Sequence, residues 1–142
     1  MCAASLLLLM MIHAPLSAQS PVGRWKTIDD KTGKPKSIVE IYAYKDEFHG
    51  RIVELFREPG EDPDPICDLC PGDKKNQKTK GMTILWGMKA KGSGWEGGSI
   101  LDPKTGDVYS CYLELVNPNK LKVRGFIGVS LLGRTQYWEK VQ

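Results

Sequence analysis

Short segments in which apolar and polar residues alternate recur along most of the chain, separated by turn residues. For example, Cys111, Leu113 and Leu115 alternate with Tyr112 and Glu114, which is the period of a strand with one buried face. Fifteen glycines and nine prolines imply frequent turns, and no convincing amphipathic helix lies between the strands. We therefore expect an all-β fold. The expected strands are 21–26, 37–44, 48–56, 81–88, 95–101, 108–116, 121–127 and 134–141.

Most connections between these strands are short, so neighbouring strands should pair as antiparallel hairpins. Asp29–Gly33 and Asp102–Gly106 are similar turns that end in glycine, the residue that tolerates positive φ. A chain of 142 residues is expected to form one domain. Closing the sheet removes its strand edges, so we favour a barrel over a sandwich. The prediction is an up-and-down barrel of about eight strands, interrupted by a long loop at 57–80 with four prolines.

The first 18 residues differ from the rest. Residues 1–12 are almost wholly apolar and are followed by Pro15 and the small pair Ser17-Ala18, which is typical of a secretory signal peptide. The apolar run is about ten residues, whereas a membrane-spanning helix needs about twenty. We predict a signal peptide at 1–18, a barrel domain at 19–142, no transmembrane segment and a periplasmic or secreted location. The net charge of +3 is too small for a nucleic-acid footprint.

Three cysteines remain in the predicted domain, namely Cys67, Cys70 and Cys111. In an oxidising compartment the simplest pairing joins Cys67 to Cys70 and leaves Cys111 as a free thiol in a strand. A redox pair would need a thiol with a lowered pKa at a helix N-terminus, but carboxylates and Pro71 surround this pair. Zinc would need Cys111 and His49 as additional ligands. We favour the disulfide and expect no metal site and no cofactor.

The 57–80 loop is rich in charge. Its carboxylates could gather a cation such as calcium, but their spacing matches no known calcium loop, and lysines follow closely. We interpret these groups as a solvated surface. The carboxylates are those of Glu58, Glu61, Asp62, Asp64, Asp68 and Asp73, and the lysines are Lys74, Lys75, Lys78 and Lys80.

Catalytic signatures are missing from the sequence. The predicted domain has a single histidine, His49, and neither a nucleophile-elbow motif nor a phosphate-binding glycine loop. An enzyme would need His49 in a pocket with two carboxylates within hydrogen-bond reach. We leave an activity open but lean towards a protein that is not an enzyme.

Two aromatic features suggest how such a barrel could close and bind. Trp25 near the start of the domain and Arg134 near its end could form a cation–π pair that seals one end, with Arg124 as the competing partner. The alternative is an ordinary core tryptophan and an ordinary surface arginine. Five aromatic residues on different strands could line a cavity for a small apolar ligand. The alternative is that they fill a solid core. They are Tyr42, Tyr44, Trp86, Trp95 and Tyr112.

The domain resembles the secreted bacterial family called domain of unknown function 2147 over residues 22–141. The resemblance is carried by Gly23-x-Trp25, Asp73-x-x-Asn76, Gly81–Ile84, Trp95-x-Gly97-Gly98-x-Ile100-x-Asp102-Pro103-x-x-Gly106, Val123–Gly128 and Leu132–Gln136 with Trp138. It implies a calycin-like or lipocalin-like barrel in exported proteins, with no established activity and no catalytic residue to transfer.

These observations favour a protein that binds a small apolar ligand or a lipid. The alternative is a structural or protein-interaction module of the cell envelope that uses the 57–80 loop and the outer strand faces. A hydrolase-type enzyme is the third possibility.

Overall fold

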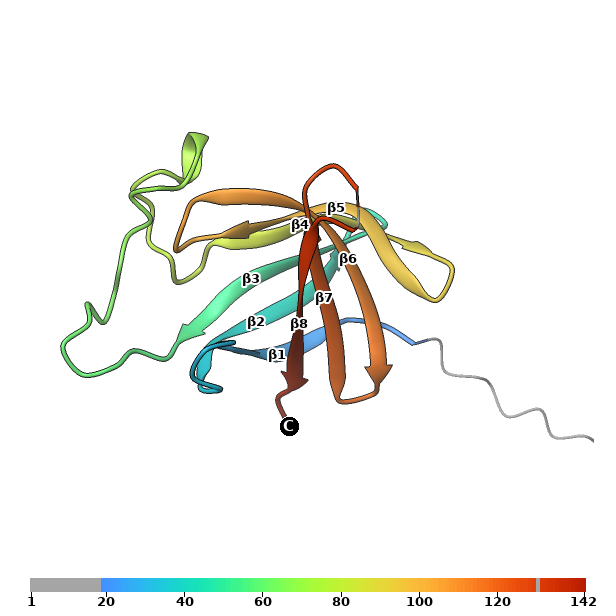
Figure 1. Cartoon of the computed structure of the whole chain (residues 1–142), viewed down its shortest axis with the longest axis horizontal. Coiled ribbons are helices and arrows are strands. Elements are labelled where there is room, and N and C mark those ends of the chain that lie inside the picture. Colours follow the sequence, from blue (N-terminus) through green and yellow to red (C-terminus); the bar gives the residue numbers. More distant parts are fainter. Residues whose placement is uncertain (1–18, 130) are drawn as a thin grey trace, which may run out of the picture.

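Eight antiparallel strands form a closed barrel in which each strand pairs with its neighbours in sequence and β8 pairs with β1 (Figure 1). The computed structural model describes residues 19–129 and 131–142, so the predicted signal peptide lies outside the described residues. The prediction of an all-β, up-and-down barrel is confirmed. The strands are β1 (Gly23–Ile28), β2 (Pro35–Tyr44), β3 (Glu47–Leu55), β4 (Thr83–Lys91), β5 (Gly94–Asp102), β6 (Asp107–Asn117), β7 (Lys120–Phe126) and β8 (Gly133–Lys140).

Successive connections of such a barrel alternate between its two ends. We call the end with the β1–β2, β3–β4, β5–β6 and β7–β8 connections the loop end. The other, which carries the three tight hairpins and both ends of the domain, is the hairpin end. The β3–β4 connection is the predicted long loop and contains one short 3-10 helix, η1 (Gly72–Lys74). In Figure 1 it extends from the barrel at the left of the view.

Large apolar side chains fill the barrel interior. Because side chains alternate along a strand, one face of every strand points inward, and the fully buried residues lie mainly on that face. Around Gly50 the packing is so tight that an added Cβ would lie 3.0 Å from Cγ1 of Val39 and 3.1 Å from Cβ of Leu85. The largest fully buried side chains of the strands are Trp25, Trp138, Ile41, Ile52, Leu85, Met88, Leu101, Leu113, Leu121 and Val39. All but Leu101 belong to this interior.

The buried core extends outside the barrel wall, beneath the long loop. Leu85 and Ile100 are paired inward-facing residues, so Ile84 and Leu101 point outward. Both are nevertheless buried, as are Cys67 and Cys70 of the loop. The loop therefore packs against the outer face of β4 and β5 and does not extend freely into solvent.

In the described part of the chain, no helix is long and apolar enough to cross a membrane.

Candidate functional site

Trp25 closes the hairpin end, and its cationic partner is Lys140. The indole is fully buried, and its Nε1 donates a hydrogen bond of 2.8 Å to the carbonyl oxygen of Pro21. The Nζ atom of Lys140 lies 4.8 Å from the ring centroid and donates a 3.0 Å hydrogen bond to the carbonyl oxygen of Val22. Gly23 makes room for this arrangement, since a Cβ there would lie 2.8 Å from Cε of Lys140.

The predicted pair of Trp25 with Arg134 is wrong for a reason of register. Trp25 pairs with Lys140 across the β1–β8 seam, which leaves Arg134 six residues away, at the loop end. Its guanidinium is exposed and forms an ion pair with Asp30 of the β1–β2 turn. The competing candidate, Arg124, donates from Nη1 to Oγ1 of Thr135 on the outer face of β7 and β8. A cation from the last strand does cover the indole, but it is a lysine.

The five candidate ligand-lining residues do not share one cavity. Only Trp95 points inward, where it is buried and contacts Phe48 edge to face with ring centroids 6.1 Å apart. Tyr112 alternates with the buried Cys111 and Leu113, so it points outward, as its 3.1 Å hydrogen bond to Glu114 indicates. The remaining three, Tyr42, Tyr44 and Trp86, also lie on the outer face. These five residues therefore cannot line one shared cavity, because Trp95 faces the interior and the other four face outward.

Tyr42 and Tyr44 form an outer cluster with His49. The His49 ring stacks on Tyr42 with centroids 5.8 Å apart and meets Tyr44 edge to face at 6.0 Å. Its Nε2 is buried without a hydrogen-bond partner and lies 3.6 Å from Oε2 of Glu47. Among the described residues no second carboxylate forms an ion pair with His49. In the described part of the chain His49 therefore has one carboxylate within ion-pair distance, and not the two that were expected for an enzyme.

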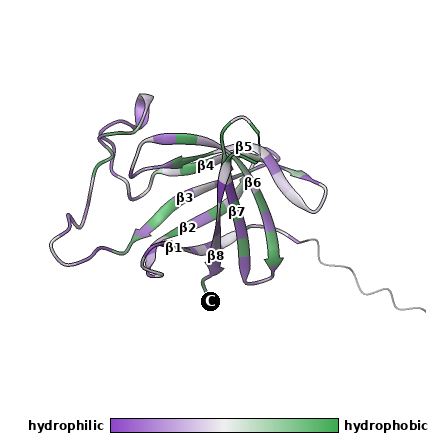
Figure 2. Ribbon diagram, viewed as in Figure 1, coloured by the Kyte–Doolittle hydropathy of each residue, from purple (hydrophilic) through white to green (hydrophobic). Residues whose placement is uncertain are grey.

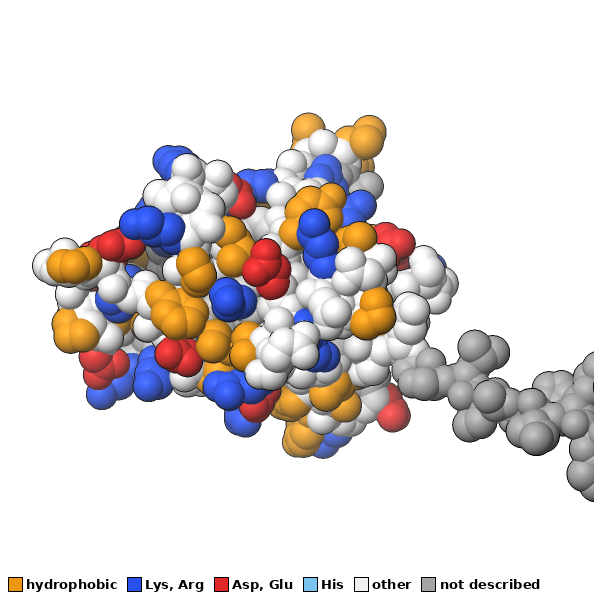
Figure 3. Space-filling model, turned by 90° about the horizontal axis from the view of Figure 1, so that it is seen from below, with side chains coloured by type: hydrophobic (Ala, Val, Ile, Leu, Met, Phe, Trp, Pro, Cys, Tyr) orange, Lys and Arg blue, Asp and Glu red, His pale blue; other side chains and the backbone are white. Residues whose placement is uncertain are grey.

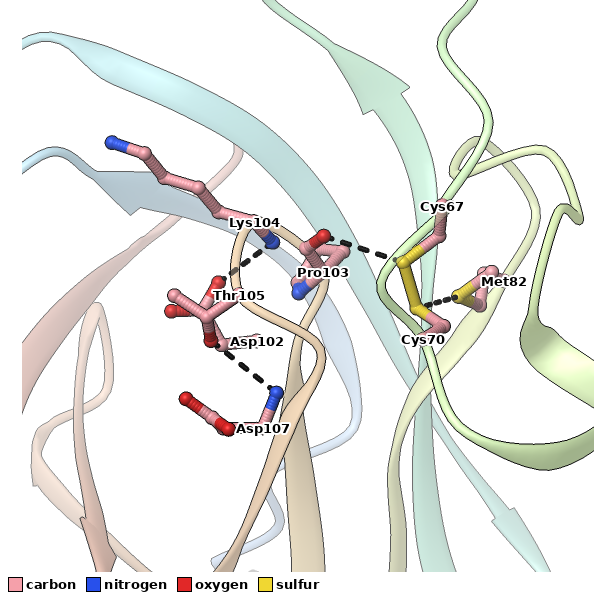
Figure 4. The surroundings of a disulfide bond; sticks show 8 residues. All are labelled: Cys67, Cys70, Met82, Asp102, Pro103, Lys104, Thr105 and Asp107. Carbon is pink, nitrogen blue, oxygen red and sulfur yellow. Dashed lines mark hydrogen bonds between the residues drawn. A yellow bond between two sulfur atoms is a disulfide. The ribbon is translucent and has the colours of Figure 1, made fainter.

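The predicted disulfide between Cys67 and Cys70 is present and anchors the long loop (Figure 4). Sγ of Cys67 lies 3.3 Å from the carbonyl oxygen of Pro103 in the β5–β6 turn, and Sγ of Cys70 lies 3.9 Å from Sδ of Met82. Because both sulfurs are bonded to each other, they cannot serve as thiolate ligands, so the zinc alternative fails. Across residues 19–129 and 131–142, no three histidine, cysteine or acidic side chains gather as a metal site.

Cys111 is the free cysteine of the described chain and is buried inside the barrel. Burial disfavours the thiolate and raises the pKa of the thiol from 9.0 to about 12. A group whose pKa is raised on folding stabilises the fold at pH values below its unfolded pKa. This contribution is therefore complete below about pH 9 and is lost as the pH rises towards 12.

We expect Cys111 to resist thiol reagents until the barrel unfolds, since the reactive thiolate is scarce and covered. A chain beginning at Gln19, which lacks Cys2, should release no colour with Ellman's reagent at pH 8 over an hour. In concentrated urea, one thiol per chain should react with the reagent. Rapid reaction of the native protein would contradict the buried placement.

An exposed apolar surface at the loop end was not predicted from the sequence. Four aliphatic side chains of the β7–β8 connection, Ile127, Val129, Leu131 and Leu132, are 66%, 58%, 88% and 68% exposed. We call these four residues the aliphatic tip. The connection is green in Figure 2 because its hydropathy is high. In contrast, on the face shown in Figure 3 hydrophobic side chains are interspersed with charges of both signs. The sequence signal was present, because this apolar run carries no charge.

Comparison with solved structures finds a protein of the human pathogen Helicobacter pylori described as belonging to the lipocalin family. The two chains are 19% identical, and the match covers 88% of this chain and 85% of the other, with a TM-score of 0.75. At this identity the likeness concerns the fold alone. No curated protein matches the chain.

The sequence profile of a family described as an uncharacterised protein conserved in bacteria matches residues 23–140, which is nearly the whole barrel. The match begins at Gly23 and ends at Lys140, the two residues that meet at the Trp25 indole. The chain belongs to this family, domain of unknown function 2147, and has a lipocalin-like barrel.

Proposed function

We propose that the protein is an exported binding barrel that takes the acyl chains of a lipid at its loop end. The aliphatic tip is the observation that carries this proposal, because four aliphatic side chains are each more than half exposed on one connection. An apolar surface of this kind on a water-soluble protein typically marks a site of interaction with lipid, ligand or protein. The lipocalin-like fold and the disulfide support an exported protein that binds apolar molecules.

The site is placed at the loop end because the interior has little room for a ligand. Tryptophan, methionine and aliphatic side chains fill the inward face of the strands. Two hollows of the described surface lie away from the interior. One lies on the outer face against Trp86, and the other lies at the hairpin end beside the β4–β5 turn. An acyl chain would therefore contact the barrel at its rim and not thread through it.

An exposed apolar tip suits contact with acyl chains. Full burial of a leucine side chain stabilises binding by about 1.5 to 3 kcal/mol. Partial insertion of the tip would still supply a substantial fraction of this free energy for each side chain. Arg134, which directly follows Gly133, remains exposed beside the tip and could face a lipid headgroup, although it is paired with Asp30.

The double substitution Leu131→Ser with Leu132→Ser should weaken binding to lipid vesicles about tenfold, since two exposed leucines lose their transfer free energy. The measurement is flotation with vesicles of phosphatidylethanolamine and phosphatidylglycerol. Val116→Ser is the matched control, because Val116 is 54% exposed but lies at the hairpin end. Its vesicle binding should equal that of the unaltered protein.

A parallel titration with soluble palmitate distinguishes a free acyl chain from a membrane surface. Binding of palmitate without vesicles would assign the tip to a single-chain ligand, whereas vesicle binding alone would assign it to the bilayer. Absence of both, or equal binding by the double variant, would overturn the proposal.

A protein-interaction module is the second candidate, because the long loop also exposes apolar side chains. Ile66 and Leu69 are exposed on the loop, and Val108 is exposed on the neighbouring strand β6. This patch lies beside the disulfide. A protein partner that docks there would lose affinity on Leu69→Ser and keep it in the Leu131 and Leu132 double variant.

A further inference from the structure

A shallow groove lies on the outer face of the barrel, between the long loop and strand β4. It is open to solvent, has a volume of about 320 Å³ and is lined by Trp86, Val108 and the loop segment Pro71–Lys74. Trp86 is half-buried and forms one wall, with Nζ of Lys74 lying 5.2 Å from its ring centroid. None of these lining residues belongs to the Trp25–Lys140 closure or to the aliphatic tip.

The loop wall of the groove is held in place by covalent and hydrogen bonds. Cys70, which directly precedes Pro71, is tied to Cys67 by the disulfide. Cys67 in turn accepts a hydrogen bond from the backbone nitrogen of Asn76 at 2.7 Å and donates its own to the carbonyl oxygen of Gln77 at 2.8 Å. The groove is therefore preorganised, which reduces the entropic cost of binding.

Polar residues lie near Trp86 both in the long loop and along the sheet. On the loop side, Asp73 is an exposed residue and Lys74 a half-buried one, and neither forms an ion pair within the described residues. On the sheet side, Trp86 pairs with Ser99, which pairs with Ser110 on the next strand. The three residues form one outward-facing row, so two serines lie on the same face of the sheet as the indole.

We propose that this groove binds a sugar ring of a glycan, stacked on Trp86. A pyranose ring has an apolar face of C–H groups and a rim of hydroxyl groups, and it therefore matches an aromatic platform with hydrogen-bonding groups around it. The Trp86 indole supplies the platform. Asp73 accepts hydrogen bonds from sugar hydroxyls, and Lys74 donates to their oxygens after its side chain leaves the ring face.

The shape of the groove favours a sugar over a purely apolar molecule. Apolar ligands gain affinity by burying most of their surface, and an open groove with a single aromatic wall cannot provide that. A sugar can keep its outer hydroxyl groups in water while one face is covered. The groove volume of about 320 Å³ lies at the lower end of the range for small-molecule sites. This volume fits one or two rings of a longer glycan.

Trp86 also supplies the spectroscopic signal for a test. The other tryptophans, Trp25, Trp95 and Trp138, are at most 5% exposed, so a ligand at the surface changes the emission of Trp86 first. Titration of the full chain with chitotetraose and with cellotetraose should give a saturable change in tryptophan emission with at least one of them. Calorimetry on the same samples provides a measurement that does not depend on the fluorophore.

Four variants separate stacking from folding. Trp86→Ala should abolish the calorimetric signal, and Trp86→Phe, which keeps an aromatic face, should retain binding within about tenfold. Asp73→Asn changes an exposed loop residue without loss of volume and should weaken binding about fivefold to tenfold. Tyr44→Ala, which removes an exposed aromatic ring outside the groove, should leave binding unchanged.

The proposal is overturned if neither oligosaccharide binds at up to about 10 mM, a range that already covers weak recognition. It is also overturned if binding survives Trp86→Ala, or if inorganic phosphate produces the same saturable change as the sugars, since the groove would then be an anion site. The experiment is independent of the vesicle assay, because the Leu131 and Leu132 double variant should bind the sugars normally.

Discussion

Trp25→Ala is expected to lower the free energy of unfolding by about 3 to 5 kcal/mol, the range for removing a large aromatic side chain from a packed core. The indole is fully buried, and its loss leaves a cavity at the hairpin end. The carbonyl oxygen of Pro21 loses its hydrogen-bond donor, and the Lys140 ammonium loses the ring that it covers. Domains of this size are stable by only about 5 to 15 kcal/mol, so much of the total would be lost.

Urea unfolding followed by circular dichroism measures this change. Trp25→Phe is the control, because it keeps most of the volume but cannot donate to Pro21, and it should cost only about 1 to 2 kcal/mol. If the alanine variant lost less than about 1 kcal/mol, the hairpin end would not depend on the indole. The role assigned to Trp25 and Lys140 would then fail.

The alternation of residues predicted the barrel because a period of two is a local property. Each inward-facing apolar residue is separated from the next by one outward-facing residue, and short turns leave antiparallel pairing as the simplest option. The Cys67–Cys70 pairing was equally local, since a short loop brings the two sulfurs together.

The cation over Trp25 could not be predicted in the same way, because it depends on the register of the β1–β8 seam. Arg134 and Lys140 have the same parity on β8, and both face the interior side of the strand. Only the pairing of Trp25 with Lys140 decides which of them reaches the indole. That register joins the first and last strands of the barrel, and no local pattern contains it.

The outward orientation of Tyr112 could have been predicted from the sequence. The same alternation that identifies its strand assigns Cys111 and Leu113 to the interior and Tyr112 to the surface. Trp86 was harder, because Leu85 and Met88 both point inward although they are three residues apart. The irregularity lies at Gly87, which has a positive φ. It interrupts the alternation of inward- and outward-facing residues along β4.

The docking of the long loop could not be predicted from its composition. Prolines and charges correctly indicated a loop, but Cys67 and Cys70 are buried, with their sulfurs against Pro103 of the β5–β6 turn and against Met82. Whether a loop folds back onto a sheet depends on tertiary contacts between residues distant in sequence. The close approach of Leu69 to Gly106 is one such contact.

Two glycines in equivalent turns make this docking testable. Gly33 and Gly106 each donate a hydrogen bond of 2.8 Å to the aspartate carbonyl oxygen four residues earlier, Asp29 and Asp102. Their φ angles are +69° and +78°. A Cβ at Gly33 would meet no atom within 4 Å, whereas one at Gly106 would overlap the carbonyl group of Leu69. The two positions therefore share backbone strain and differ in contact with the loop.

Gly33→Ala should lower the free energy of unfolding by about 1 kcal/mol, the cost of placing alanine at positive φ. Gly106→Ala should cost about 3 kcal/mol, because the loop must also move off the sheet and expose part of the cluster that contains Ile84 and Leu101. Trypsin should then cleave the Gly106 variant faster than the Gly33 variant at the lysines that follow η1. Equal stability and equal cleavage of the two variants would mean that the loop is not held against the β5–β6 turn. The groove beside Trp86 would then lack its fixed wall.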